Sequence, residues 1–340
     1  MKHILGMAAV VASLIALPAA AQQTFNFKLS NFAPEGSSVT RAFKAYVDEW
    51  KAKSNGRITL ELFHGSSMGP MPRHYDLART GVADFAFYQH GATPGRFPLT
   101  ELTHMPYLWP EGAKGALVGA RVASELYKDY LAREHTDTHN LYVVFNRPSG
   151  IYDANKPIRA LADLKNRRYR APTTTDVAMF KELGAVPIGV PAPGMAEALQ
   201  KGTLDGVVTD EMGVFAFKLG DLVKNYTPMF TSAISFGLAM NKAAYEKLPA
   251  DLRAIIDYES TTARAVWMVE SSWGNVPEVD KYLTDSKIAT VRLSSADDAN
   301  MRKIADKIIE ERIKEVAAKG LPAKEFYDKA KALSAKYAKE

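Results

Sequence analysis

The chain has 340 residues, of which 47% are hydrophobic and none is cysteine. Since one domain typically takes roughly 100–200 residues, two domains are expected. The lack of cysteine excludes disulfide bonds, thiolate catalysis and cysteine-ligated metal sites. The formal net charge of +5 is spread along the chain instead of forming the basic stripe of a nucleic-acid binder, so no nucleic-acid partner is expected.

The first residues have the layout of a secretory signal peptide. Lys2 and His3 precede an apolar run from Ile4 to Leu17, and Pro18-Ala19-Ala20-Ala21 follows. This run is shorter than the ~20 apolar residues that a membrane-spanning helix needs. We therefore expect residues 1–21 to be a leader that is cleaved after Ala21, which places the mature chain in the periplasm.

Strand-like and helix-like segments alternate after the leader. The apolar and polar patterns predict strands at Thr24 to Ser30, Ile58 to Phe63 and Ala83 to Tyr88, and helices at Ser38 to Ser54 and Pro72 to Thr80. The first helix carries Phe43, Tyr46 and Trp50 on one face, and Asn55-Gly56 ends it. Repeated strand–helix units of this kind indicate a parallel or mixed α/β sheet.

A second run of such units begins near residue 141. Strands are predicted at Leu141 to Phe145, Tyr169 to Ala171, Val186 to Val190, Asp205 to Thr209 and Ser235 to Met240. Helices are predicted at Asp176 to Leu183, Gly194 to Lys201, Leu252 to Val269, Asp297 to Ala318 and Ala323 to Lys339. The chain is therefore expected to fold as two α/β lobes wrapped by C-terminal helices.

Two short motifs suggest chemistry, and each has a simpler explanation. Gly65-Ser66-Ser67-Met68-Gly69 matches the G-x-S-x-G pattern, in which Ser67 would be the nucleophile of a serine hydrolase. However, Pro70 and Pro72 follow at once, which favours a plain Gly/Ser turn. His135 and His139 stand four residues apart, but a catalytic zinc site needs three protein ligands, so a solvated loop without metal is the preferred interpretation.

Arg170 is the strongest candidate for a binding residue. It stands at the end of the strand predicted at Tyr169 to Ala171 and before the next helix. In open α/β sheets, ligands bind at the carboxyl ends of the strands. A guanidinium at such a position can hold a carboxylate through two parallel hydrogen bonds. A solvated basic edge is the alternative, because Lys165, Arg167 and Arg168 are close in sequence.

Short motifs lie in a fixed order along the chain: Asn55-Gly56-Arg57, Gly81-Val82-Ala83-Asp84, Pro106-Tyr107-Leu108, Asp163-Leu164-Lys165, Tyr169-Arg170-Ala171-Pro172, Leu183-Gly184-Ala185, Ala198-Leu199-Gln200-Lys201-Gly202, Asp205-Gly206, Met240-Asn241-Lys242 and Leu248-Pro249-Ala250-Asp251-Leu252. In their order and spacing, these motifs resemble the solute-binding proteins of TRAP (tripartite ATP-independent periplasmic) transporters, the DctP-like family. The resemblance covers essentially the whole mature chain.

The resemblance implies a two-lobed periplasmic-binding-protein architecture that closes on its ligand by a hinge. Lobe I is expected to comprise residues 22–147 and 236–275, and lobe II residues 148–235 and 276–340. The resemblance also implies that Arg170 clamps a carboxylate, that the partners are the TRAP membrane subunits, and that the protein is neither an enzyme nor dependent on a cofactor. The sequence departs from many members at Thr209, where they carry Asn, and at Gly150-Ile151-Tyr152, where they carry Gly-Phe-Arg.

The run from Tyr88 to Pro98 resembles a subgroup whose members tend to bind hydrophobic or aromatic monocarboxylates, which implies such a ligand here. Gln89, His90 and Thr209 would supply neutral hydrogen bonds to it. Aromatic residues near strand ends could form the walls of its pocket or belong to the core: Phe32, Tyr88, Phe145, Phe215 and Phe236. The rival hypotheses are a periplasmic hydrolase that uses Ser67 and a binding protein of an ATP-driven importer.

Overall fold

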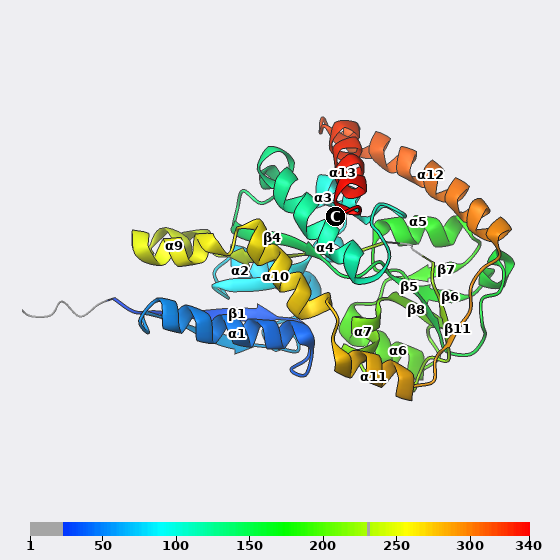
Figure 1. The fold of residues 1–340 in the computed structure, drawn as a ribbon, viewed down its shortest axis with the longest axis horizontal. Helices are drawn as coiled ribbons and strands as arrows, with labels where there is room; N and C mark the ends of the chain where they lie inside the picture. Colours follow the sequence, from blue (N-terminus) through cyan, green and yellow to red (C-terminus); the bar gives the residue numbers. More distant parts are fainter. Residues whose placement is uncertain (1–22, 230–231) are drawn as a thin grey trace, which may run out of the picture.

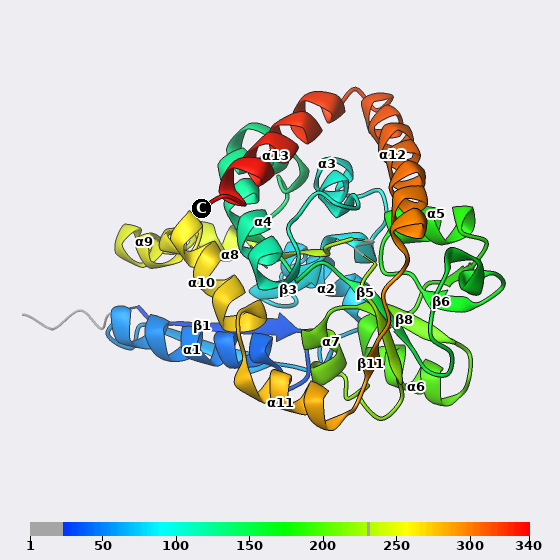
Figure 2. The ribbon, with the colours of Figure 1, turned by 45° about the vertical axis from the view of Figure 1, so that its right-hand side comes forward.

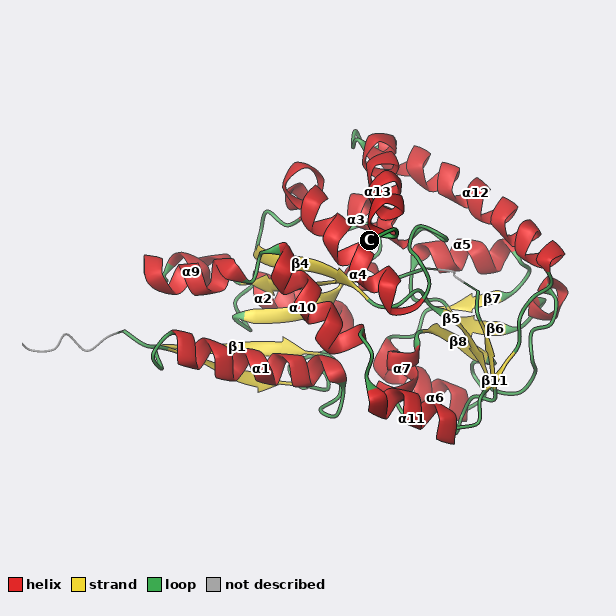
Figure 3. Cartoon of the chain, in the orientation of Figure 1, coloured by secondary structure: helices red, strands yellow, loops and turns green. Residues whose placement is uncertain are grey.

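The computed structural model describes residues 23–229 and 232–340, so the predicted leader and its cleavage site lie outside the described residues. The strands form two separate mixed sheets with helices around them (Figure 1). Figure 3 shows the two groups of strands, one on each side of the molecule. The predicted two-lobed α/β fold is confirmed. In the part of the chain that is described, no helix combines the length and apolarity needed to cross a membrane.

The sheet of lobe I has the strand order β2-β1-β3-β10-β4. Its strands are β1 (Phe25–Asn31), β2 (Ile58–Phe63), β3 (Phe85–Gln89), β4 (His139–Phe145) and β10 (Ser235–Met240). β1 is parallel to β2 and β3, while β10 is antiparallel to β3 and β4. The sheet is therefore mixed, because β10 enters it from the other lobe. β2 and β10 have the bounds that the sequence predicts.

The sheet of lobe II has the strand order β11-β9-β5-β8-β6-β7. Its strands are β5 (Gly150–Asp153), β6 (Arg168–Arg170), β7 (Val186–Ile188), β8 (Gly206–Thr209), β9 (Asn225–Thr227) and β11 (Ala289–Thr290). β6 is parallel to β7 and β8, and β5 is antiparallel to β8 and β9. The ends of the parallel strands β6 and β8 thus emerge side by side at one edge of the sheet.

Helices cover both sheets. Those of lobe I are α1 (Ser38–Lys53), α2 (His74–Arg79), α3 (Pro98–Glu101), α4 (Gly112–Leu126), α8 (Lys242–Glu246), α9 (Ala250–Tyr258) and α10 (Thr262–Trp273). Those of lobe II are α5 (Thr174–Glu182), α6 (Met195–Gln200), α7 (Glu211–Ala216) and α11 (Pro277–Asp285). The C-terminal helices are α12 (Ser295–Ala317) and α13 (Ala323–Tyr337).

Local sequence explains why α1 begins and ends where it does. The Ser37 side chain accepts a hydrogen bond from the Thr40 N–H, which caps the first turn. The helix ends before Asn55 and Gly56, whose φ angles of 52° and 78° are left-handed. Its buried face contains Phe43, Tyr46 and Trp50, as their spacing predicts, and it packs against β2 and α10.

The long helix predicted from Leu252 to Val269 is wrong, because the chain turns between α9 and α10. Glu259 is fully buried at this turn, and the Thr261 side chain accepts a hydrogen bond from the Arg264 N–H to cap α10. The spacing of apolar residues continues through both helices, so the sequence pattern predicts one helix instead of two.

The chain passes between the lobes after β4, before β10 and after α10. α12 contacts α5 of lobe II, and α13 contacts α4 of lobe I; Figure 2 shows α13 beside α4. We propose lobe I as residues 22–147 and 236–275 and lobe II as residues 148–235 and 276–340, with α13 leaning back onto lobe I. The C-terminal helices thus bridge the outer faces of both lobes.

Candidate functional site

A cavity lies between the two lobes. Lobe I lines it with residues at the ends of β1, β3 and α10 and at the start of β10, and lobe II lines it with residues at the ends of β6 and β8 and on α7. The centre of a water-sized sphere can move within about 70 Å³ of this cavity. That volume is several times the volume that a single buried water needs. Its place at the carboxyl ends of parallel strands is where α/β sheets bind ligands.

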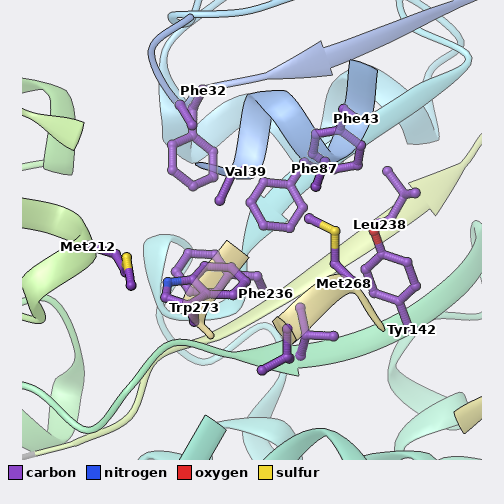
Figure 4. Packing of buried hydrophobic residues seen from close by; sticks show 14 of the residues in the cluster. Phe32, Val39, Phe43, Phe87, Tyr142, Met212, Phe236, Leu238, Met268 and Trp273 are labelled. Carbon is purple, nitrogen blue, oxygen red and sulfur yellow. The ribbon is translucent and has the colours of Figure 1, made fainter. Parts of the chain in front are cut away.

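Lobe I contributes an aromatic wall, which we define as Phe32, Phe87, Phe236 and Trp273. The ring centroids of Phe32 and Phe87 are 5.5 Å apart, those of Phe87 and Phe236 are 5.4 Å apart, and those of Phe236 and Trp273 are 5.3 Å apart. Each of these pairs is stacked within 15–19° of parallel. Figure 4 shows these rings together, with Met212 of α7 facing them from lobe II. The wall offers flat apolar surface suited to an aromatic or branched apolar group.

Lobe II contributes a cation, Arg170, at the end of β6. Its Nε donates to the Val190 carbonyl at 3.0 Å, and its Nη1 donates to the Val208 carbonyl at 2.7 Å. Burial lowers the pKa of Arg170 to about 10, while Asp176 and Asp210 act in the opposite direction. The guanidinium therefore remains charged at neutral pH.

The hydrogen bonds of Arg170 leave part of its fork available. The hydrogen bonds of Arg170 to the described residues run from Nε and Nη1, and none of them runs from Nη2. A guanidinium has five N–H donors, so Nη2 and one N–H of Nη1 remain for a carboxylate in bidentate geometry. Because the two carbonyls fix the plane of the group, little rotamer entropy is lost when it binds.

Neutral polar groups complete the cavity. Gln89, Thr209 and Asn146 line it, and all three are buried. The Gln89 Nε2 donates to the carbonyl of Pro172 at 3.4 Å, which joins lobe I to lobe II. Gln89 and Arg170 also line a second cavity, whose volume by the same measure is about 290 Å³. These two side chains thus stand where the inner cavity meets an outer space.

Five of the nine predicted site residues line the inner cavity: Arg170, Gln89, Thr209, Phe32 and Phe236. The structure does not place Tyr88, His90, Phe145 or Phe215 there.

Strand alternation explains why Tyr88 and Phe145 lie elsewhere. In β3, Phe87 and Gln89 reach the cavity, so Tyr88 between them points to the opposite face. There the Tyr88 hydroxyl donates to Oδ1 of Asn140 at 2.8 Å. In β4, Phe145 likewise faces away from the cavity and packs on Trp109, with ring centroids 5.1 Å apart.

His90 and Phe215 also have structural surroundings. His90 follows β3 and is fully buried, with its Nε2 3.1 Å from Nε2 of His135 and 3.2 Å from the Tyr88 hydroxyl oxygen. Phe215 packs on Tyr282 of α11, with ring centroids 5.5 Å apart. On α7 the side that reaches the cavity carries Met212 and Ala216, and Phe215 lies off it.

Sequence reasoning missed Phe87, Asn146, Asp210, Met212 and Trp273. Phe87 could have been found, since it shares the face of Gln89 in the same strand. Trp273 has no local signal, because it reaches the cavity only through the packing of α10.

Arg147 holds Trp273 in place at the crossing between the lobes. Its Nε donates to the Trp273 carbonyl at 2.9 Å, and its Nη2 donates to the Gly274 carbonyl at 2.6 Å. Its Nη1 lies 3.8 Å from Oε2 of Glu211 on α7. Arg147 therefore ties two connections between the lobes to the first turn of α7.

Neither the G-x-S-x-G motif at Ser67 nor the pair His135 and His139 forms a catalytic arrangement in the structure. Ser67 is exposed in a turn after β2, and a short 3-10 helix (Met71–Arg73) follows where a nucleophile elbow needs an α-helix. The interpretation of His135 as part of a solvated loop is wrong, because the side chain is buried against Phe97, with ring centroids 5.0 Å apart. In residues 23–229 and 232–340, no group of three or more metal-ligating side chains occurs.

Known proteins match this chain over most of its length. The sequence profile of the DctP family, described as "Bacterial extracellular solute-binding protein, family 7", matches residues 29–315. A solute-binding protein of Albidiferax ferrireducens is 24% identical over 267 residues, which is 74% of this chain and 75% of that protein.

Two solved structures are similar in sequence as well as in fold. A TRAP solute-binding protein from a marine metagenome, specific for aromatic acid ligands and bound to 3-hydroxybenzoate, has a TM-score of 0.86 and 28% identity, covering 93% of this chain and 99% of that one. A TRAP solute-binding protein from Rhodoferax ferrireducens T118, bound to copurified benzoate, has a TM-score of 0.87 and 28% identity with the same coverage. The chain therefore belongs to family 7 of the bacterial extracellular solute-binding proteins and is a solute-binding protein of the TRAP type.

Proposed function

We propose that this protein captures an aromatic monocarboxylate in the periplasm and delivers it, chemically unchanged, to the membrane subunits of a TRAP transporter. The observation that carries the proposal is the pairing of one buried cation, Arg170, with a stacked aromatic wall across a small cavity between the lobes. Residues 1–21 would direct export and be removed after Ala21.

The cavity fits such a ligand at both ends. The carboxylate would bind the available N–H groups of Arg170, with Gln89 and Thr209 beside it, and the ring would lie on the aromatic wall. A charged hydrogen bond in a site closed to water contributes more than a neutral one. The chain departs from the family's second arginine at Gly150-Ile151-Tyr152, which favours one carboxylate over two. The benzoate and 3-hydroxybenzoate held by the two similar structures support the same class.

A TRAP partner is favoured over an ATP-driven importer because the similar structures are TRAP proteins. The hydrolase hypothesis is disfavoured, because Ser67 lies in an exposed turn and not in the strained strand-to-helix turn of a nucleophile elbow.

Calorimetric titration of the mature protein with benzoate and related acids tests the proposal. Arg170→Ala should lose affinity by at least about 100-fold, because it removes the charged partner of a buried carboxylate. Arg170→Lys should retain part of the affinity, since an ammonium keeps the charge but not the fork. The ligand should be recovered unchanged after incubation, as mass spectrometry would show.

Arg168→Ala is the matched control. Arg168 lies on the same strand, but its guanidinium pairs with Asp205 at 2.8 Å on the surface, with 43% of its side chain exposed. This variant should bind as the wild type does. Equal binding by wild type and Arg170→Ala would contradict the proposed site, and no binding of any aromatic acid by the wild type would contradict the ligand class.

A further inference from the structure

Asp210 is a buried carboxyl group in the wall of the ligand cavity. It is only 4% exposed and stands at the start of α7, where its Oδ1 accepts a hydrogen bond from the Gly213 N–H at 2.7 Å. Its Oδ2 is buried and has no hydrogen-bond partner among the described residues. A buried polar atom without a partner is costly, so an unfilled acceptor beside a ligand cavity indicates a group that the ligand supplies.

The surroundings of Asp210 leave it able to serve in two protonation states. Burial raises its pKa to about 7, and the neighbouring Glu211 acts in the same direction. The N–H groups of Gly213 and Arg147 act against this, although the Arg147 N–H does not reach hydrogen-bond geometry. Asp210 therefore takes up a proton more readily than an ordinary aspartate does.

Asp210 also lies next to the carboxylate clamp. Arg170 pairs with Val207 across β6 and β8, and Asp210 follows the end of β8, so both residues stand at the same edge of the lobe II sheet. The electrostatic coupling of Asp210 with Arg170 reflects this proximity. Both residues line the same cavity as the aromatic wall.

We infer that Asp210 recognises a hydroxyl group of the ligand, so that the protein prefers hydroxylated aromatic monocarboxylates over the unsubstituted acids. This inference rests on the proposed function and narrows its substrate class. A hydroxyl can donate to a carboxylate and can accept from a carboxylic acid, so it satisfies Oδ2 in either state. An ammonium could form an ion pair only with the carboxylate form of Asp210. An aromatic C–H would satisfy neither the carboxylate nor the carboxylic acid.

The decisive measurement is the ratio of affinities for hydroxylated and unsubstituted acids. Wild-type protein is titrated calorimetrically with benzoate and with 2-, 3- and 4-hydroxybenzoate at pH 7. At least one hydroxybenzoate should bind about tenfold or more tightly than benzoate, the size expected for one hydrogen bond to a buried charged group. In Asp210→Ser this ratio should fall to near one.

Serine keeps the helix cap, because its hydroxyl replaces Oδ1, but it has no second oxygen. Asn241→Ala is the matched control: Asn241 accepts from the Ala244 N–H to cap α8, and it does not line the cavity. That variant should keep the wild-type ratio although it loses a cap.

Each outcome has one interpretation. If wild type binds benzoate at least as tightly as every hydroxybenzoate, or if Asp210→Ser keeps the preference, the inference is wrong while the proposed function stands. If phenylalanine binds more tightly than the hydroxybenzoates and depends on Asp210, the side chain recognises an ammonium, and the inference is again overturned. If no acid binds, or if Arg170→Ala binds as wild type does, it is the proposed function that fails.

Discussion

Gly237 allows the ring of Tyr88 to lie across strand β10. The two residues are directly opposite each other in the pairing of β3 and β10. A Cβ at position 237 would be 2.4 Å from the Tyr88 hydroxyl oxygen and 2.5 Å from Cζ. This close approach lets the hydroxyl donate to Asn140 and keeps Tyr88 in the core of lobe I, away from the cavity.

Gly237→Ala should lower the free energy of unfolding by about 1–3 kcal/mol, because Tyr88 must move and its hydrogen bond to Asn140 is strained. Denaturant unfolding measures the change. Gly36→Ala is the control, since a Cβ there has nothing within 4 Å, and it should change stability by less than about 0.5 kcal/mol. Equal effects of the two substitutions would show that Tyr88 is not packed on β10 as described.

At the scale of elements, the turn between α9 and α10 is built around a buried ion pair. Glu259 accepts from Nε of Arg264 at 2.8 Å and from Nε1 of Trp50 at 3.1 Å. Arg264 also donates to Glu49 at 2.9 Å. Burial raises the pKa of Glu259, and Arg264 opposes the shift. The carboxylate thus joins α10 to α1 at the turn.

Glu259→Ala should destabilise the protein by about 3–5 kcal/mol, because it leaves a buried guanidinium and an indole N–H without their shared acceptor. Ser260→Ala, one residue further in the same turn and exposed, should have an effect below about 0.5 kcal/mol. Chemical unfolding of both variants makes the comparison. A loss under about 1 kcal/mol for Glu259→Ala would mean that the turn does not depend on the ion pair.

Across the whole molecule, the lobes are joined by contacts away from the ligand cavity as well as at its mouth. Glu101 of lobe I is buried and accepts from Oγ1 of Thr174 at 3.3 Å and from Nη2 of Arg312 on α12 at 3.4 Å. Gln89 adds its hydrogen bond to Pro172. Polar contacts between lobes can separate with little apolar surface exposed.

The stability of the whole molecule should fall in mild acid because of buried histidines. Burial lowers the pKa of His104 to about 3 and that of His135 to about 4, and it also lowers the pKa of His90. An unfolded histidine titrates near pH ~6.5. Since the unfolded chain binds more protons between the two values, the free energy of unfolding is at its full value above pH ~6.5 and falls as the pH drops towards 4.

The variant His104→Gln tests this effect, because glutamine can still hydrogen-bond to Ser235, which His104 contacts at 2.7 Å. Its free energy of unfolding should change less steeply between pH 4 and 6.5 than that of wild type, by up to about 1.4 kcal/mol per pH unit. Buried carboxyl groups with raised pKa, such as Glu101 and Glu134, act in the opposite direction in both proteins, so the difference isolates the histidine. Parallel curves would contradict the expectation.

Several features of the fold follow from the sequence alone. Periodicity and turn residues predict most strands and helices, because hydrogen bonds and side-chain spacing within an element are local. The bounds of β2 and β10 agree with prediction, and Arg170 stands at the end of β6 as its position before Ala171-Pro172 indicates. Motif order along the chain predicts the family, which the matched profile confirms.

The tertiary structure decided which side chains meet in the cavity. Periodicity shows that Phe87 and Tyr88 point in opposite directions, but only the packing of lobe II against lobe I decides which of them faces the ligand space. Trp273 and Asp210 reach the same cavity from segments distant in sequence. Length and pattern also failed to place the break at Glu259, because the apolar period continues across it and Glu259 is held there by Arg264 of α10 and by Trp50 of the distant helix α1. Local sequence thus determines the elements, and long-range packing determines the binding site.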